Sequence, residues 1–149
     1  MKKTSDEPHL RIKAEVNSTE DLEKVQSAII RLFEPLQFQT KTVGQQTYVT
    51  AESSEPEPLA KFSMLLQKEQ IRSAARRILL QGMTDRKITF FLNKQVASAG
   101  HISFCEPFAE SPLGPIKVEI DSIDPIELVD WLAPRISQPQ RERPRKRRK

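Results

Sequence analysis

The sequence has one cysteine, four scattered glycines and no long apolar run among its 149 residues. Cys105 cannot form a disulfide within the chain and has no second cysteine at zinc-site spacing, which excludes a disulfide scaffold and a zinc finger. The glycines, at positions 44, 82, 100 and 114, form neither G-x-G-x-x-G nor G-x-x-x-x-G-K-[ST]. Dinucleotide and P-loop phosphate binding therefore lack their glycine-rich loop, and no cofactor is predicted.

Apolar stretches such as residues 88–92 have the length of a strand, far below the roughly 20 residues that a membrane helix needs. The first three residues, Met1-Lys2-Lys3, lead into polar residues 4–7 rather than into the apolar core of a signal peptide. Together with the sparse use of cysteine, these features predict a cytoplasmic protein without a membrane partner.

Charge is distributed unevenly along the chain. The 24 Lys and Arg residues exceed the 20 Asp and Glu residues, for a net charge of +4. Residues 141–149 hold seven of the basic residues and one of the acidic ones, so the other 140 residues carry 17 basic and 19 acidic side chains. The pattern predicts a mildly acidic folded body followed by a strongly basic C-terminal end.

Periodicity indicates the elements of the first third of the chain. Residues 10–16 alternate apolar and charged side chains, as in a strand with one buried face. Ser18 or Thr19 can cap a helix whose apolar residues recur at three-four spacing until Pro35. The opening of the chain is therefore predicted to be a strand followed by a helix.

The middle of the chain combines a hairpin with a divided helical segment. Residues 47–52 are predicted to form a strand that can pair with residues 37–43. Residues 58–80 have helical periodicity, but their two apolar stripes lie on nearly opposite sides. A straight helix cannot bury both stripes against one sheet, so we expect a break at residues 67–70, with Gly82 ending the second helix.

The last third is predicted to contain three strands and a helix. Residues 88–92 and 116–120 alternate strongly, and residues 101–105 form a weaker strand candidate. Asp124 is expected to cap the final helix, on which Trp131 is interpreted as a core anchor. The mixed order of elements is typical of an α+β fold rather than a doubly wound α/β fold.

Basic side chains are the remaining functional candidates, because no acid–base or nucleophilic constellation is evident and no enzymatic activity is predicted. Lys68, Arg72 and Arg76 recur every four residues and can form a ridge that follows a phosphate backbone, although a solvated helix face explains them nearly as well. Asn93-Lys94-Gln95 offers a cation and two amides that could contact RNA, or could instead cap the end of the strand.

The C-terminal end is a stronger signal for polyanion binding. It contains two prolines but no apolar residue that could bury surface, so we expect residues 137–149 to form a disordered tail, and residues 1–8 a flexible N-terminus. RNA is the expected counter-charge, although acidic proteins, membrane surfaces or a nuclear-import receptor would also attract the tail. The candidate RNA-binding residues of the tail are Arg141, Arg143, Arg145, Lys146, Arg147, Arg148 and Lys149.

Three motifs resemble those of an archaeal family of uncharacterised proteins, number 0201. They are ITFFLNKQVASAGHISF (88–104), ESPLGPIKVEI (110–120) and DPIELVDWLAPR (124–135), and weaker agreement extends over residues 9–136. The family is described as RNA-binding and similar in fold to ribosomal protein L-five. The resemblance implies one α+β domain over 9–136 with helices on one face of a curved, mainly antiparallel sheet, no known catalytic activity, and a connection to RNA or the ribosome.

Two functional hypotheses follow from these features. The leading hypothesis is a non-enzymatic RNA-binding protein, associated with ribosomal RNA or ribosomal subunits, whose body makes a few specific contacts while the tail supplies electrostatic affinity. The alternative is a protein-interaction or assembly module that the tail tethers near nucleic acid. In that case exposed strand edges and Phe91 would contact a protein partner or form a homodimer.

Overall fold

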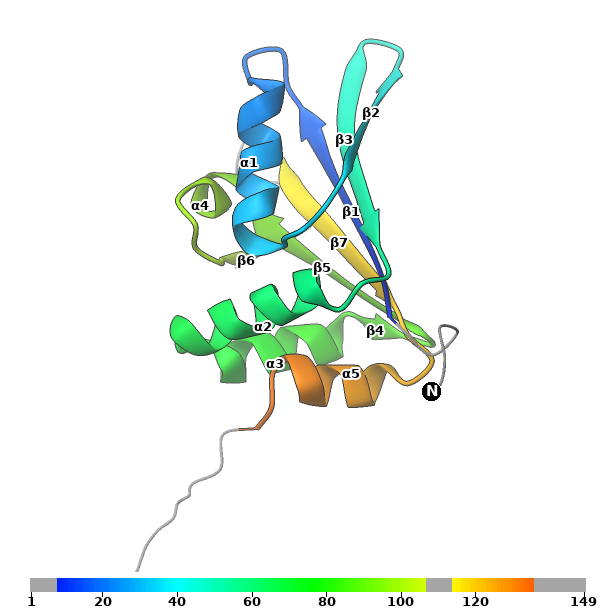
Figure 1. Ribbon diagram of the computed structural model, residues 1–149, viewed down its shortest axis with the longest axis vertical. Helices are drawn as coiled ribbons and strands as arrows, with labels where there is room; N and C mark the ends of the chain where they lie inside the picture. The colour runs from blue at the N-terminus through cyan, green and yellow to red at the C-terminus, as the bar shows by residue number, and fades with distance from the viewer. Residues whose placement is uncertain (1–7, 107–113, 136–149) are drawn as a thin grey trace, which may run out of the picture.

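The computed structural model describes residues 8–106 and 114–135, which form one antiparallel sheet with helices packed on one of its faces (Figure 1). Every pairing between neighbouring strands is antiparallel. From one edge to the other the strands are β2 (Phe38–Val43), β3 (Gln46–Ser53), β1 (His9–Val16), β7 (Pro115–Asp121), β5 (Lys87–Asn93) and β4 (Met83–Thr84), and β6 (Phe104–Cys105) pairs with β5.

The helices form two groups (Figure 1). One group lies beside the hairpin end of the sheet, and the other lies at the opposite end, where its three helices pack against one another. The first group consists of α1 (Leu22–Leu32) and α4 (Lys94–Ser98), and the second of α2 (Glu57–Lys68), α3 (Arg72–Gln81) and α5 (Pro125–Leu132). This arrangement confirms the predicted α+β fold.

The alternation of apolar and polar residues directs one face of every central strand into the core. In β1, Leu10, Ile12 and Ala14 are buried against the helices, and β5 and β7 contribute their alternate residues in the same way. Aromatic rings join the layers, since Phe62 of α2 stacks on Phe90 of β5 with centroids 5.6 Å apart. The opposite face of the sheet has no helix over it among the described residues, and its side chains are only partly buried or exposed.

Two predicted helix boundaries, the cap of α1 and the break between α2 and α3, can be compared with the structure. The cap of α1 is Asp21, whose carboxylate accepts a hydrogen bond from the backbone N–H of Glu23 at 3.0 Å, so the prediction of Ser18 or Thr19 was wrong. The break between α2 and α3 is confirmed, because Gln70 has a φ of 60°. The chain can therefore redirect its apolar stripe between the two helices.

Gly82 ends α3 as predicted, but it does not adopt the left-handed conformation that usually favours glycine at the end of a helix. Its φ is −88°, which other residues also adopt. A Cβ atom there would overlap the backbone carbonyl of Thr89, because β5 passes close to the end of the helix. Close approach of two backbone segments, rather than a left-handed conformation, is what requires glycine at this position.

The predicted strand at residues 101–105 is shorter than expected. Only Phe104 and Cys105 pair with β5, while the His101 ring lies 3.0 Å from the Glu69 carboxylate at the end of α2. Within residues 8–106 and 114–135, no helix combines the length and the hydrophobicity that crossing a membrane requires.

Candidate nucleic-acid interface

The predicted ridge of Lys68, Arg72 and Arg76 is not aligned along one helix. Lys68 is the last residue of α2 and Arg72 the first of α3, with Gln70 and its positive φ between them. Arg76 Nη1 lies 2.7 Å from the Asp130 carboxylate and donates a hydrogen bond to the carbonyl of Ala133. Arg76 therefore links α3 to α5, and the three cations do not follow the face of a single helix.

The three residues after β5 divide into structural and exposed positions. Asn93 accepts a hydrogen bond from the N–H of Val96 at 2.9 Å and caps α4. Lys94 is only 3% exposed, and its Nζ lies 2.9 Å from the Glu20 carboxylate and donates to the carbonyl of Glu15 at 2.7 Å. Asn93 thus caps the helix that follows the strand, rather than the strand end as the alternative had it. Lys94 is held inside the fold, and Gln95 is exposed.

The partner of Lys94 is a partly buried carboxylate with a shifted pKa. Burial alone would raise the pKa of Glu20, but hydrogen bonds from Asn17 and Lys94, together with the charge of Lys94, outweigh burial and lower the pKa below 4.5. Glu20 therefore remains ionised in the fold. The resulting ion pair joins the loop before α1 to the start of α4.

The predicted binding residues of the C-terminal tail, Arg141 to Lys149, lie outside the described residues. Within the described residues, the open face of the sheet carries a basic surface.

Two lysines lie directly opposite each other at the centre of this open face. Lys13 of β1 is in register with Lys117 of β7, and their neighbours in the same row are Thr50 of β3 and Phe91 of β5. This row holds two positive charges and no carboxylate. Like charges placed directly opposite each other on neighbouring strands are unfavourable, and here the two side chains have separate partners, since the Lys117 ammonium lies 3.5 Å from Glu119 and the Lys13 ammonium lies over the Tyr48 ring.

Aromatic rings flank this lysine pair on both sides. The Lys13 Nζ lies 4.4 Å from the centroid of the Tyr48 ring, and Tyr48 in turn faces Lys41 of β2. On the other side, Phe91 lies directly across from Lys117 and is partly exposed. We refer to these residues as the lysine–aromatic surface, which comprises Lys13, Lys41, Tyr48, Phe91 and Lys117.

Most carboxylates of the open face lie away from Lys41 and Tyr48, but Glu15 lies directly across from Tyr48, and Glu119 reaches Lys117. Glu119 is shared by three cations, since it lies 3.5 Å from Arg11, 3.8 Å from Lys87 and 3.5 Å from Lys117. Arg11 also contacts Asp121 at 3.0 Å, and His9 contacts Glu52 at 2.8 Å. The lysine–aromatic surface has three lysines with Glu15 beside them, so positive charge dominates that end and can attract phosphate groups.

Only part of this surface was identified from the sequence. The alternating pattern placed Phe91 on the less buried face, but Lys13, Lys41, Tyr48 and Lys117 were not identified as candidates. The same alternation marks each of them as facing outward. Their proximity depends on which strands are neighbours and in which register, and this information is not local.

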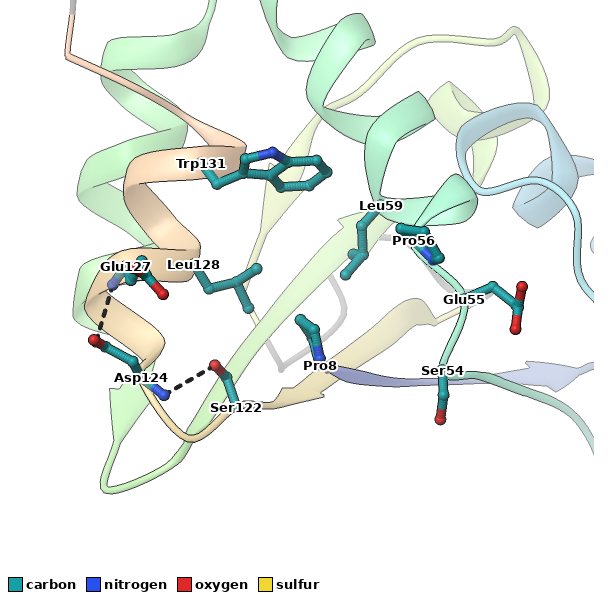
Figure 2. A pocket seen from close by; sticks show the side chains of 10 residues that line it. All are labelled: Pro8, Ser54, Glu55, Pro56, Leu59, Ser122, Asp124, Glu127, Leu128 and Trp131. Carbon is teal, nitrogen blue, oxygen red and sulfur yellow. Dashed lines mark hydrogen bonds between the residues drawn. The ribbon is translucent and has the colours of Figure 1, made fainter. Parts of the chain in front are cut away.

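A groove of about 480 Å³ lies on the helical side of the protein, between α5 and the start of α2 (Figure 2). Leu59, Leu128 and Trp131 contribute apolar surface to it, and Glu55 and Glu127 add carboxylates. Trp131 is 48% exposed, so its interpretation as a core anchor was wrong. The carboxylates disfavour phosphate, and the exposed indole suits a protein partner better than RNA.

We predict that Lys94→Ala lowers the free energy of unfolding by about 3 kcal/mol at neutral pH, because it leaves the Glu20 carboxylate partly buried without its cation. Gln95→Ala, an exposed neighbour, should change it by less than about 0.5 kcal/mol. Urea unfolding monitored by circular dichroism provides the measurement.

The difference in unfolding free energy between Lys94→Ala and the parent protein should depend on pH, and this dependence tests the ion pair itself. A carboxylate with a lowered folded-state pKa stabilises the fold above its ordinary pKa of 4.5, and this stabilisation is lost as the pH falls through the folded-state value. The difference in unfolding free energy between Lys94→Ala and the parent protein should therefore become smaller below pH 4.5. A difference that is constant over this range would contradict the assigned pair.

Comparisons with known proteins agree with the resemblance noted from the motifs. A family model described as "RNA binding" matches residues 9–122. The UPF0201 protein of Sulfolobus acidocaldarius is 41% identical over 127 residues, which cover 85% of this chain and 88% of the relative. The UPF0201 protein of Sulfurisphaera tokodaii is 42% identical with the same coverage.

Solved structures give the same result. The crystal structure of a UPF0201 protein from Methanococcus jannaschii superposes with a TM-score of 0.76 at 28% identity, covering 87% of this chain and 95% of that one. The fold, the motifs and the sequence identity thus agree, whereas the likeness to ribosomal protein L-five stays a prediction. The chain belongs to the UPF0201 family.

Proposed function

We propose that this chain is a non-enzymatic RNA-binding protein that contacts RNA through the lysine–aromatic surface and gains electrostatic affinity from residues 141–149. The observation that carries the proposal is the opposed Lys13–Lys117 pair. An RNA phosphate bound beside these lysines would add an attraction that Glu119 and the Tyr48 ring supply only in part. The description of the matching family model as RNA binding supports the same function.

The proposed target is ribosomal RNA or a ribosomal subunit in the cytoplasm, as the resemblance to family 0201 implies. In this proposal the body and the tail have different tasks. The tail, with seven cations and no apolar side chain, binds phosphates without regard to sequence. The body offers fixed positions for a few contacts and therefore determines which RNA is preferred.

Replacing the seven basic residues of 141–149 by glutamine, at constant length, should weaken binding to all RNAs alike. If about five of these charges contact single-stranded phosphates, the slope of log K against log salt should become less steep by about 3.5, at about 0.7 counterion per contact. Fluorescence anisotropy at several salt concentrations measures this slope. An unchanged slope would remove the tail from the interface.

The double variant Lys13→Gln/Lys117→Gln should bind RNA more weakly and have a salt slope that is less steep by about 1.4, since two phosphate contacts are lost. The same variant loses the Lys117–Glu119 ion pair and the Lys13–Tyr48 contact together with the like-charge pair, so urea unfolding is measured beside binding to show that the fold is retained. Lys24→Gln/Arg77→Gln, with two exposed cations on the helical side, is the matched control. An equal loss of RNA binding in the control would move the interface to the helices.

The alternative function, a protein-interaction or assembly module that includes a possible homodimer, is favoured by one observation, the exposed Trp131 in the groove of Figure 2. Purification from native extract separates the two functions. Recovery with ribosomal subunits that is lost on RNase treatment supports RNA binding. A stoichiometric protein partner that resists RNase and is released by Trp131→Ala would support the assembly function instead.

A further inference from the structure

The lysine–aromatic surface has a geometry that distinguishes between forms of RNA. Phe91 on β5 and Tyr48 on β3 are separated by β7 and β1, and Tyr48 is two residues along β3 from the row of Phe91. With strands about 4.8 Å apart and about 3.4 Å per residue, their backbones lie roughly 16 Å from each other. Lys117 and Lys13 occupy the two strands between them. Positive charge therefore lies between two aromatic rings on one solvent-facing surface.

From this order of side chains we infer that the surface binds single-stranded RNA, with unpaired bases stacked on Phe91 and Tyr48 and the intervening phosphates held by Lys117 and Lys13. This inference rests on the proposed RNA-binding function and adds the form of the ligand and the role of each residue. Stacking on aromatic side chains combined with backbone contacts to cations is how proteins commonly bind unpaired strands.

Phe91 is the residue that points most directly to stacking. Its neighbour Phe90 fills the core, where it stacks with Phe62, and Phe104 completes the same cluster. Phe91 faces the other way, beside Lys117 and Cys105, and is partly exposed. The core is filled without this ring, so an aromatic side chain on the open face is explained by a ligand with a flat surface.

The Tyr48 ring makes a cation–π contact that RNA binding would replace. The Lys13 ammonium lies over its ring at 4.4 Å, an interaction that is weak when exposed to water. A phosphate beside Lys13 would attract the ammonium more strongly and free the ring for a base. RNA binding would thus replace the cation–π contact between Lys13 and Tyr48 with an ion pair at Lys13 and a base stacked on Tyr48.

The surrounding charges restrict the path of the strand. Glu52 and Asp121 lie at the other end of the open face and would repel phosphates. Glu119 and Glu15 border the surface itself, the first beside Lys117 and the second across from Tyr48, and narrow the path that phosphates can take. Lys41, on the outer strand β2, extends the positive charge beyond Tyr48. The RNA strand should therefore run across the β-strands, from β5 towards β2, and not along them.

A duplex would meet this surface differently. Its bases are paired and stacked on one another, so neither ring can reach a base face, and only the lysines would contact its phosphates. The aromatic side chains should therefore contribute to binding of a single strand and not to binding of a duplex. This difference can be measured with variants of the full-length protein.

The test uses a short, end-labelled oligoribonucleotide of mixed sequence and a duplex of the same length, titrated with the full chain in an anisotropy assay. Phe91→Leu should weaken single-strand binding about tenfold, as expected for one lost stacked base, and leave duplex binding unchanged. Phe38→Leu is the matched control, because Phe38 is also an aromatic strand residue but packs against the core. It should alter neither affinity.

A second variant tests stacking independently of stability. Phe91→Trp in a Trp131→Phe background leaves one tryptophan, at position 91, because Trp131 is the only natural one. Its fluorescence should be quenched by the single strand and not by the duplex, with single-strand affinity retained.

Three results would overturn the inference. They are an unchanged single-strand affinity for Phe91→Leu, an equal loss for strand and duplex, and a change in self-association instead of RNA binding. The last result would assign Phe91 to contacts between copies of the chain. If the parent protein bound neither RNA in dilute buffer, the proposed function itself would fail, which distinguishes the two failures.

Discussion

The structure depends on the burial of one face of an antiparallel sheet. Successive side chains of a strand point to opposite faces. In β1, β5 and β7, each residue buried in the core is therefore followed by a residue on the open face. The helices cover only the apolar face. The open face is therefore free of packing constraints, and its side chains can be selected for binding.

Two lysines illustrate how differently one side chain is used in this fold. Lys94 is buried, and the cost of removing its charge from water is offset by Glu20 and a backbone carbonyl. Lys117, on the open face, is opposite Lys13 and shares Glu119 with Arg11 and Lys87. Lys94 supports the architecture, whereas the charge of Lys117 is only partly neutralised within the protein. Burial and partners, rather than residue type, separate the structural Lys94 from Lys117, the cation proposed to bind RNA.

Much of the fold could be predicted from local signals, and the candidate site could not. Period-two alternation found β1, β5 and β7, and the opposed stripes of residues 58–80 located the break at Gln70. The same local reasoning treated Lys68, Arg72 and Arg76 as one regular ridge, but the break at Gln70 places Lys68 on α2 and the two arginines on α3. It also missed Lys13 and Lys117, because residues more than one hundred positions apart become neighbours only through the sheet register.

The separation of charge between body and tail has a consequence for recognition. A tail with seven cations can give affinity for any RNA, and its contribution falls steeply with salt. Stacking on Phe91 and Tyr48 would be much less sensitive to salt, since it does not release counterions. As the salt concentration rises, the open face should therefore determine a growing share of the binding free energy, and the preference among RNAs should sharpen as total affinity declines.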